Sequence, residues 1–237
     1  MSTQPALTDA QRVVLLVQAQ LEVAELIAGA VPPVGVPHSR PDVEVLVGEI
    51  EEARPPARPG GPFRVFLSPA TLAGPVEDRR WSLAHELSHV CLGHEDPEVR
   101  RSTTRLGAVW AVLVAGVVAA GVVVLARLGY PLSLSNVSGP LLIAVGGGAV
   151  VAGARVSAQR TLRRERAADG YAAAVVGVAM TAAVRDRIAA HEATFRARTD
   201  RCLWTHPPVA ERYLTTQQAL AERLRPDGVT GSGDGAR

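Results

Sequence analysis

Lysine is absent from this 237-residue chain, and all 25 of its basic residues are arginines. We attribute this absence to the coding bias of a high-GC genome. The 23 acidic residues nearly balance the arginines, which leaves a formal net charge of +2. No compact basic run is interleaved with aromatic residues. The composition therefore excludes a nucleic-acid-binding tract, and we expect no nucleic-acid partner.

Cysteines and aromatic residues are also scarce. The two cysteines, Cys91 and Cys202, form neither a C-x-x-C pair nor a disulfide framework, so we expect a reducing, intracellular setting. Aromatic residues make up 4% of the chain and hydrophobic residues 47%, so Ala, Val and Leu supply most of the apolar surface. Charged residues at 20% argue against disorder. The length predicts one domain, or one domain with an appendage.

Charge is missing from two long stretches. Residues 106–126 contain no charged side chain, and a helix of that length rises about 31 Å, close to the thickness of a bilayer core. A shorter, glycine-rich stretch at residues 139–154 is the expected second span. Arginines flank both stretches and the loop between them carries only Arg127, so the positive-inside rule places both termini in the cytoplasm. We predict a two-span hairpin in the cell membrane; the alternative is a pair of buried helices in a soluble bundle.

The remaining sequence predicts short helices and strands. Thr8 or Asp9 can cap the first helix, and a Pro/Gly-rich connector separates the two strands. The expected elements are helices over residues 11–28, 76–92 and 171–184, and strands at Val43–Val47 and Phe63–Leu67. The predicted fold class is mainly α with a small β-sheet, plus a two-helix transmembrane hairpin.

One motif carries the clearest chemical signal. Residues 85–89 read His-Glu-Leu-Ser-His, an H-E-x-x-H motif inside the predicted helix over residues 76–92. His85 and His89 are four positions apart on one helical face, so both imidazoles can bind one Zn²⁺. Glu86 projects beside that ion, where it can take a proton from water.

A catalytic zinc site needs a third protein ligand. Glu165 and Asp169 are again four residues apart on one helical face. Glu165 can be the third ligand, and Asp169 can accept a hydrogen bond from a ligand imidazole. A solvated glutamate with arginine neighbours is the alternative. Two membrane crossings between the motifs leave both on the same side of the bilayer.

A third motif follows, Thr205-His206-Pro207-Pro208 with Arg212 four residues further on. His206 and Arg212 could donate to the oxyanion that forms when water attacks a peptide carbonyl. An ordinary helix start with proline in the first turn explains the same residues equally well.

These motifs, in this order around a predicted hairpin, resemble the HtpX-like zinc metallopeptidases, a group that includes the CAAX prenyl endopeptidases. The resemblance covers about residues 43–220 and implies a zincin-like, α+β metalloprotease domain with a gluzincin site. In that site one Zn²⁺ per chain is bound by His85, His89 and Glu165. The resemblance further implies Glu86 as the catalytic base, Asp169 as a support for the ligands, and His206 and Arg212 as groups that stabilise the transition state.

The same resemblance implies an edge strand at Phe63–Leu67. An extended substrate can add to such an edge as another strand, so the implied substrate-binding residues are Phe63, Arg64, Val65, Phe66 and Leu67. Residues 81–94 and 165–172 are also similar to the ImmA/IrrE peptidases, which regulate by cleaving repressors.

We therefore expect a membrane-anchored zinc endopeptidase that cleaves polypeptides in or near the bilayer at the cytoplasmic face. The alternatives are a regulatory ImmA/IrrE-type peptidase that cleaves one signalling protein, and a non-catalytic, zinc-stabilised membrane scaffold. The sequence leaves the oligomeric state open. The expected domains are an N-terminal helix and connector (1–41), the first half of the metalloprotease domain (42–104), the hairpin (105–155), the second half (156–225) and a disordered tail (226–237).

Overall fold

The computed structural model describes residues 7–31, 41–94, 138–196 and 206–225, together with single positions between 112 and 129. The chain divides into two compact units. One comprises Met1–Leu92, Arg166–His191 and Pro208–Arg237, and the other comprises Gly93–Glu165 and Glu192–Pro207. The predicted connector at residues 32–41 lies outside the described residues except for its last position, and the predicted C-terminal tail at residues 226–237 lies wholly outside them.

The first helix, α1 (Asp9–Gly29), begins where the capping signal predicts. The Thr8 hydroxyl accepts from the backbone of Gln11, and the Gln11 side chain accepts from the Thr8 backbone, so two free N–H groups of the first turn are satisfied. Further along, the Gln20 amide bonds to the backbone of β1 at Val43 and Val45. One polar side chain thus fixes the helix against the sheet.

The sheet has three strands, in the order β1-β3-β2. β1 (Val43–Val47) runs parallel to β3 (Phe63–Leu67), and β2 (Glu52–Arg54) runs antiparallel to β3. The two predicted strands are confirmed, and so is a mainly α fold with a small sheet. The predicted edge position of Phe63–Leu67 is wrong, because β2 forms at the start of the expected connector and pairs with the second side of β3.

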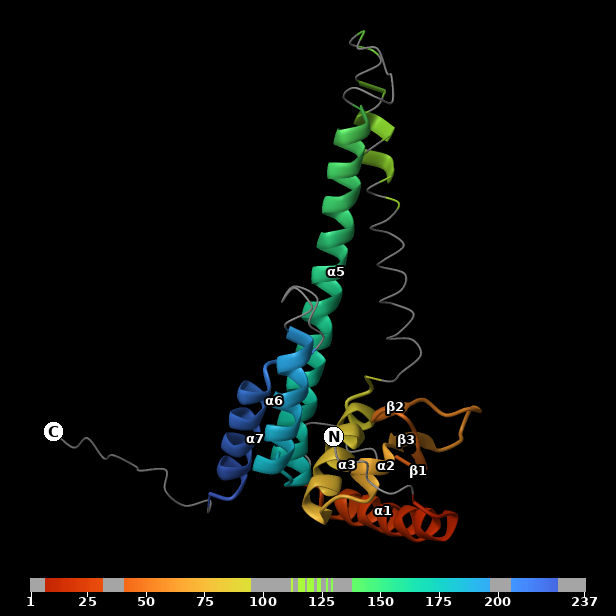
Figure 1. The fold of residues 1–237 in the computed structure, drawn as a ribbon, viewed down its shortest axis with the longest axis vertical. Helices are drawn as coiled ribbons and strands as arrows, with labels where there is room; N and C mark the ends of the chain where they lie inside the picture. Colours follow the sequence, from red (N-terminus) through yellow and green to blue (C-terminus); the bar gives the residue numbers. More distant parts are fainter. Residues whose placement is uncertain are drawn as a thin grey trace, which may run out of the picture. The chain divides into compact units, whose positions relative to one another are not determined.

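Two further helices follow the sheet: α2 (Pro69–Leu72) and α3 (Val76–Cys91). α3 confirms the predicted helix, with Glu77 and Asp78 in the first turn, where acidic groups complement the helix dipole. It contacts α1, β2 and β3, and Figure 1 shows α1 running beneath α3 and the sheet. A buried ion pair of 2.6 Å between Arg79 and Glu22 joins α3 to α1.

The C-terminal half contains α5 (Ser138–Tyr171), a π-helical turn η1 (Ala172–Val176), α6 (Ala182–Arg196) and α7 (Val209–Arg223). The continuous helix predicted over residues 171–184 is therefore wrong. The chain breaks at Gly177, which has a left-handed φ of 84°. A Cβ there would clash with the guanidinium of Arg223, which donates to the carbonyl of Val175.

The predicted membrane hairpin is only partly covered by the structure. Within the described residues, no helix combines the length and the apolar character needed to cross a bilayer. Most of the first predicted span, residues 106–126, lies outside them, and the second, residues 139–154, falls in the part of α5 where few side chains are described. The hairpin stays a prediction.

Candidate metal centre

α3 places the residues of the H-E-x-x-H motif in the interior. His85, Glu86 and His89 are 9%, 7% and 9% exposed. The Nε2 atoms of His85 and His89 are 3.2 Å apart, and the two ring planes meet at 85°. The four-residue spacing on one helix therefore brings two imidazole nitrogens together.

Glu165 joins this pair. His85, His89 and Glu165 each offer one ligand atom, and these atoms all lie within 4.8 Å of one another. Glu165 is 7% exposed and belongs to α5, one turn before Asp169. Because α5 continues unbroken from Glu165 to Asp169, the helix itself sets the spacing of the two carboxylates.

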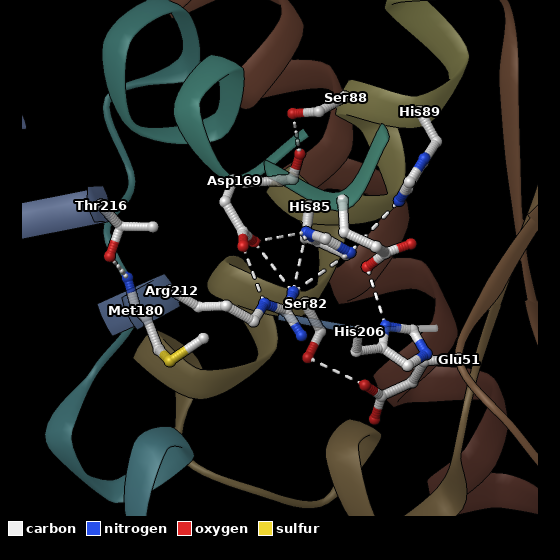
Figure 2. Close-up of polar contacts among 12 residues, drawn as sticks. Glu51, Ser82, His85, Ser88, His89, Asp169, Met180, His206, Arg212 and Thr216 are labelled. Carbon is white, nitrogen blue, oxygen red and sulfur yellow. Dashed lines mark hydrogen bonds and ion pairs between the residues drawn. The ribbon is translucent and has the colours of Figure 1, made fainter. Parts of the chain in front are cut away.

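Asp169 orients the first histidine. Its Oδ1 lies 3.0 Å from Nδ1 of His85, and Nε and Nη2 of Arg212 donate to its two oxygens at 2.7 and 2.8 Å (Figure 2). Burial by itself raises the pKa of Asp169, but the hydrogen bonds from Arg212 and His85 outweigh burial and hold that pKa below its usual value. An ionised Asp169 favours a proton on Nδ1 of His85, which leaves Nε2 as the nitrogen that can bind an ion.

The structure gives His206 and Arg212 different acidic partners. Nδ1 of His206, whose side chain is 59% exposed, lies 3.0 Å from Oε2 of Glu165. Arg212 is buried against Asp169, and its Nη2 is also 3.4 Å from both ring nitrogens of His85. These contacts support a positioning role for Arg212. Donation by either residue to an oxyanion stays a prediction.

The residues of β3 have a structural role in the sheet. Val65 and Leu67 are fully buried in the core, and the strand bonds to neighbours on both sides. A substrate strand therefore has no free edge on β3. The outer side of β2 is the alternative edge for an added strand. β2 contacts α3, the helix that carries the histidines, and among the described residues it pairs with β3 alone.

Glu51, which precedes β2, belongs to no sequence motif but makes several contacts in the structure. Its Oε1 accepts from the hydroxyl of Thr71 and lies 3.4 Å from that of Ser68, while its Oε2 is 3.3 Å from the hydroxyl of Ser82. Figure 2 shows Ser82 reaching Glu51 from the helix that carries His85. No motif marks these four residues, because tertiary packing alone brings them together.

The geometry of the three-residue group suits zinc. Two nitrogen ligands at about 2.05 Å from a tetrahedral zinc ion are about 3.3 Å apart, close to the 3.2 Å between the two Nε2 atoms. Two imidazoles and one carboxylate also form a donor set typical of catalytic zinc, with a fourth position left for water.

The fold and this group define a class: a mainly α domain with a small mixed sheet and a buried His–His–Glu group that could hold a metal ion, as zincin-like sites do. Comparison with family models, with curated proteins and with solved structures finds no match for the chain. The geometry of the site therefore carries the functional argument.

Proposed function

We propose that this chain is a zinc-dependent endopeptidase in which Glu86 is the general base. The observation that carries the proposal is the buried group of His85, His89 and Glu165, whose ligand atoms lie within 4.8 Å of one another. Glu86 directly follows the first of these residues. A purely structural zinc site usually fills all four positions and has no need of a base.

When bound, the ion would supply Lewis-acid polarisation of a peptide carbonyl and of water. Glu86 would accept a proton from the attacking water and pass it to the leaving amine.

The Asp169–Arg212 pair supports the ligands. Asp169 holds the ring of His85 through Nδ1, and the two hydrogen bonds from Arg212 hold Asp169 in turn. Such partners of a metal ligand fix its tautomer and orientation, and their loss typically weakens metal binding by about 10–100-fold. Arg212 therefore acts on the reaction through Asp169 and His85.

A polypeptide is the proposed substrate. The outer edge of β2 offers backbone groups to which an extended chain can add as a strand, and β2 lies against the helix that carries the histidines. The uncharged run at residues 106–126 supports anchorage at a membrane, with the site at the cytoplasmic face. Proteins in or near the bilayer are then the proposed targets.

The test is metal content together with hydrolysis of a fluorescein-labelled unfolded protein by detergent-purified protein. We expect about one zinc per chain, and hydrolysis that a chelator abolishes. Glu86→Gln should retain zinc and lose at least about a hundredfold in rate. Glu165→Ala should lose zinc, whereas Glu211→Gln, a surface control on α7, should change neither.

Three outcomes would contradict the proposal. Full activity of a zinc-loaded Glu86→Gln protein removes Glu86 as the base. Unchanged zinc in Glu165→Ala removes Glu165 as a ligand. Unfolding on metal removal, with no hydrolysis by the zinc-loaded protein, would favour the scaffold alternative.

A further inference from the structure

A second carboxylate lies near the candidate metal group and has a different kind of environment. Glu51 is exposed, and both of its oxygens face hydroxyl groups of Ser68, Thr71 and Ser82. Within the described residues, no arginine or histidine forms an ion pair with it. Among the residues that the structure describes, its carboxylate therefore contacts neutral donors.

The position of Ser82 relates Glu51 to the metal group. Ser82, His85, Glu86 and His89 stand at positions i, i+3, i+4 and i+7 of α3, so they share one face of the helix. One helical turn, about 5 Å along the axis, separates Ser82 from His85. Ser82 is the first side chain in this row, which also contains the two histidines and the proposed base. Through its hydrogen bond with Ser82, Glu51 lies at that end of the row.

The hydroxyl groups fix the direction of this carboxylate. Thr71 and Ser82 are 3% and 5% exposed, so bulk water does not readily replace them as donors. An ionised carboxylate has about four lone-pair positions, and the three hydroxyls occupy at most three of them. An oriented, solvent-accessible carboxylate with spare acceptor capacity is well suited to a guanidinium or ammonium group.

We propose that Glu51 is a specificity-determining residue that binds an arginine or lysine side chain of the substrate, close to the scissile bond. The proposal rests on the peptidase function argued above and adds a substrate class to it. The next residue, Glu52, begins β2, so a peptide added to the outer edge of that strand would pass Glu51 as it leaves the metal group.

Binding tests the proposal without any turnover. Zinc-loaded Glu86→Gln protein would be titrated with labelled nonapeptides in which one position in turn is arginine, citrulline or glutamate. Citrulline has nearly the shape of arginine without its charge. We expect the best arginine peptide to bind about tenfold more tightly than its citrulline counterpart, in line with a hydrogen bond between charged groups, and the glutamate peptide to bind more weakly than either.

The second arm removes the charge at Glu51. Glu51→Gln, added to the same protein, keeps an acceptor for Thr71 and should make the arginine and citrulline peptides bind equally. Glu49→Gln is the matched control, since Glu49 is an exposed glutamate of the same loop, and it should preserve the tenfold preference. The arginine–citrulline comparison in the unaltered loop remains decisive even if Glu51→Gln fails to fold.

The outcomes separate the two proposals. Equal affinity for arginine and citrulline at every position, or no binding of any arginine peptide, overturns the role of Glu51. A preference that survives Glu51→Gln in a folded protein overturns it as well. Absence of zinc-dependent hydrolysis by the wild-type protein overturns the peptidase function, while the binding result still decides whether Glu51 recognises cations.

Discussion

Two carboxylates reach α3, the helix that carries His85 and His89, from opposite kinds of environment. Asp169 is 1% exposed and is bonded to Arg212 and to His85, so a buried cation balances its charge. Glu51 is exposed, and among the described residues its hydrogen-bond partners are hydroxyl groups. Their contact points on α3, His85 and Ser82, are one helical turn apart. Neighbouring groups, rather than the carboxylate itself, therefore decide which acid is structural and which is available to a ligand.

Arg212→Met should produce the largest effect. It leaves Asp169 buried without its cation, and removal of one partner from a buried ion pair typically costs about 3–5 kcal/mol. Urea unfolding of the metal-free protein measures this loss directly.

Arg166→Met is the matched control for that experiment. Arg166 pairs with Glu211 at 2.7 Å, but both side chains are more than 40% exposed, so the expected loss is below about 1 kcal/mol. Equal losses for the two variants would show that the Asp169 pair does not differ from a surface pair.

Asp169→Asn should have the next largest effect. The amide keeps an acceptor for Arg212 but removes the negative charge that faces its guanidinium, for an expected cost of about 2 kcal/mol. Zinc affinity should fall by about 10–100-fold, because His85 loses its charged partner. Competition with a chelator measures the affinity, and an unchanged value would show that Asp169 does not orient the ligand.

The pH dependence of stability provides a separate measurement on Asp169. Its pKa is lower in the folded protein than in the unfolded chain. Asp169 therefore stabilises the folded protein fully above its pKa in the unfolded chain, near 3.9. This stabilisation is lost as the pH falls through its pKa in the folded protein. Metal-free wild type should lose stability over that acidic range more steeply than Asp169→Asn, as monitored by circular dichroism.

The comparison also shows what the sequence could predict. His85 and His89 lie four positions apart on one helix, a relation set by local geometry alone, and the structure brings them together as expected. The sequence alone cannot show that Glu165 lies near the two histidines, because tertiary packing brings them together. The spacing of Asp169, one helical turn after Glu165, could be predicted from the sequence. The role of Glu51 could not be predicted, because its hydroxyl partners come from two other segments, α2 with its N-cap and α3.

The error at the sheet has a related cause. β2 is three residues long, too short for its alternation of side chains to distinguish it from a loop. Without β2, the second side of β3 looks like a free edge. The break at Gly177 was missed because the sequence around it is uniformly apolar, while the Arg223 side chain that packs against it comes from α7.

Ser82→Ala should have a smaller effect than either substitution at the buried pair. It removes one neutral donor from Glu51 without stranding a charge, so the expected cost is about 1 kcal/mol. The change also loosens the carboxylate, which should reduce the preference for the arginine peptide over citrulline while leaving zinc content unchanged. A loss of zinc would instead tie Ser82 to the ligands.

Glu51→Gln should change stability least. The carboxylate is exposed, has no cationic partner among the described residues, and is replaced by a group that still accepts from Thr71. The free energy of unfolding should therefore change by less than about 0.5 kcal/mol, as expected for surface substitutions. Urea unfolding beside Glu49→Gln provides the measurement. A loss of about 2 kcal/mol or more would mean that the hydroxyl cluster needs the charge to fold, and Glu51 would then join Asp169 as a structural acid.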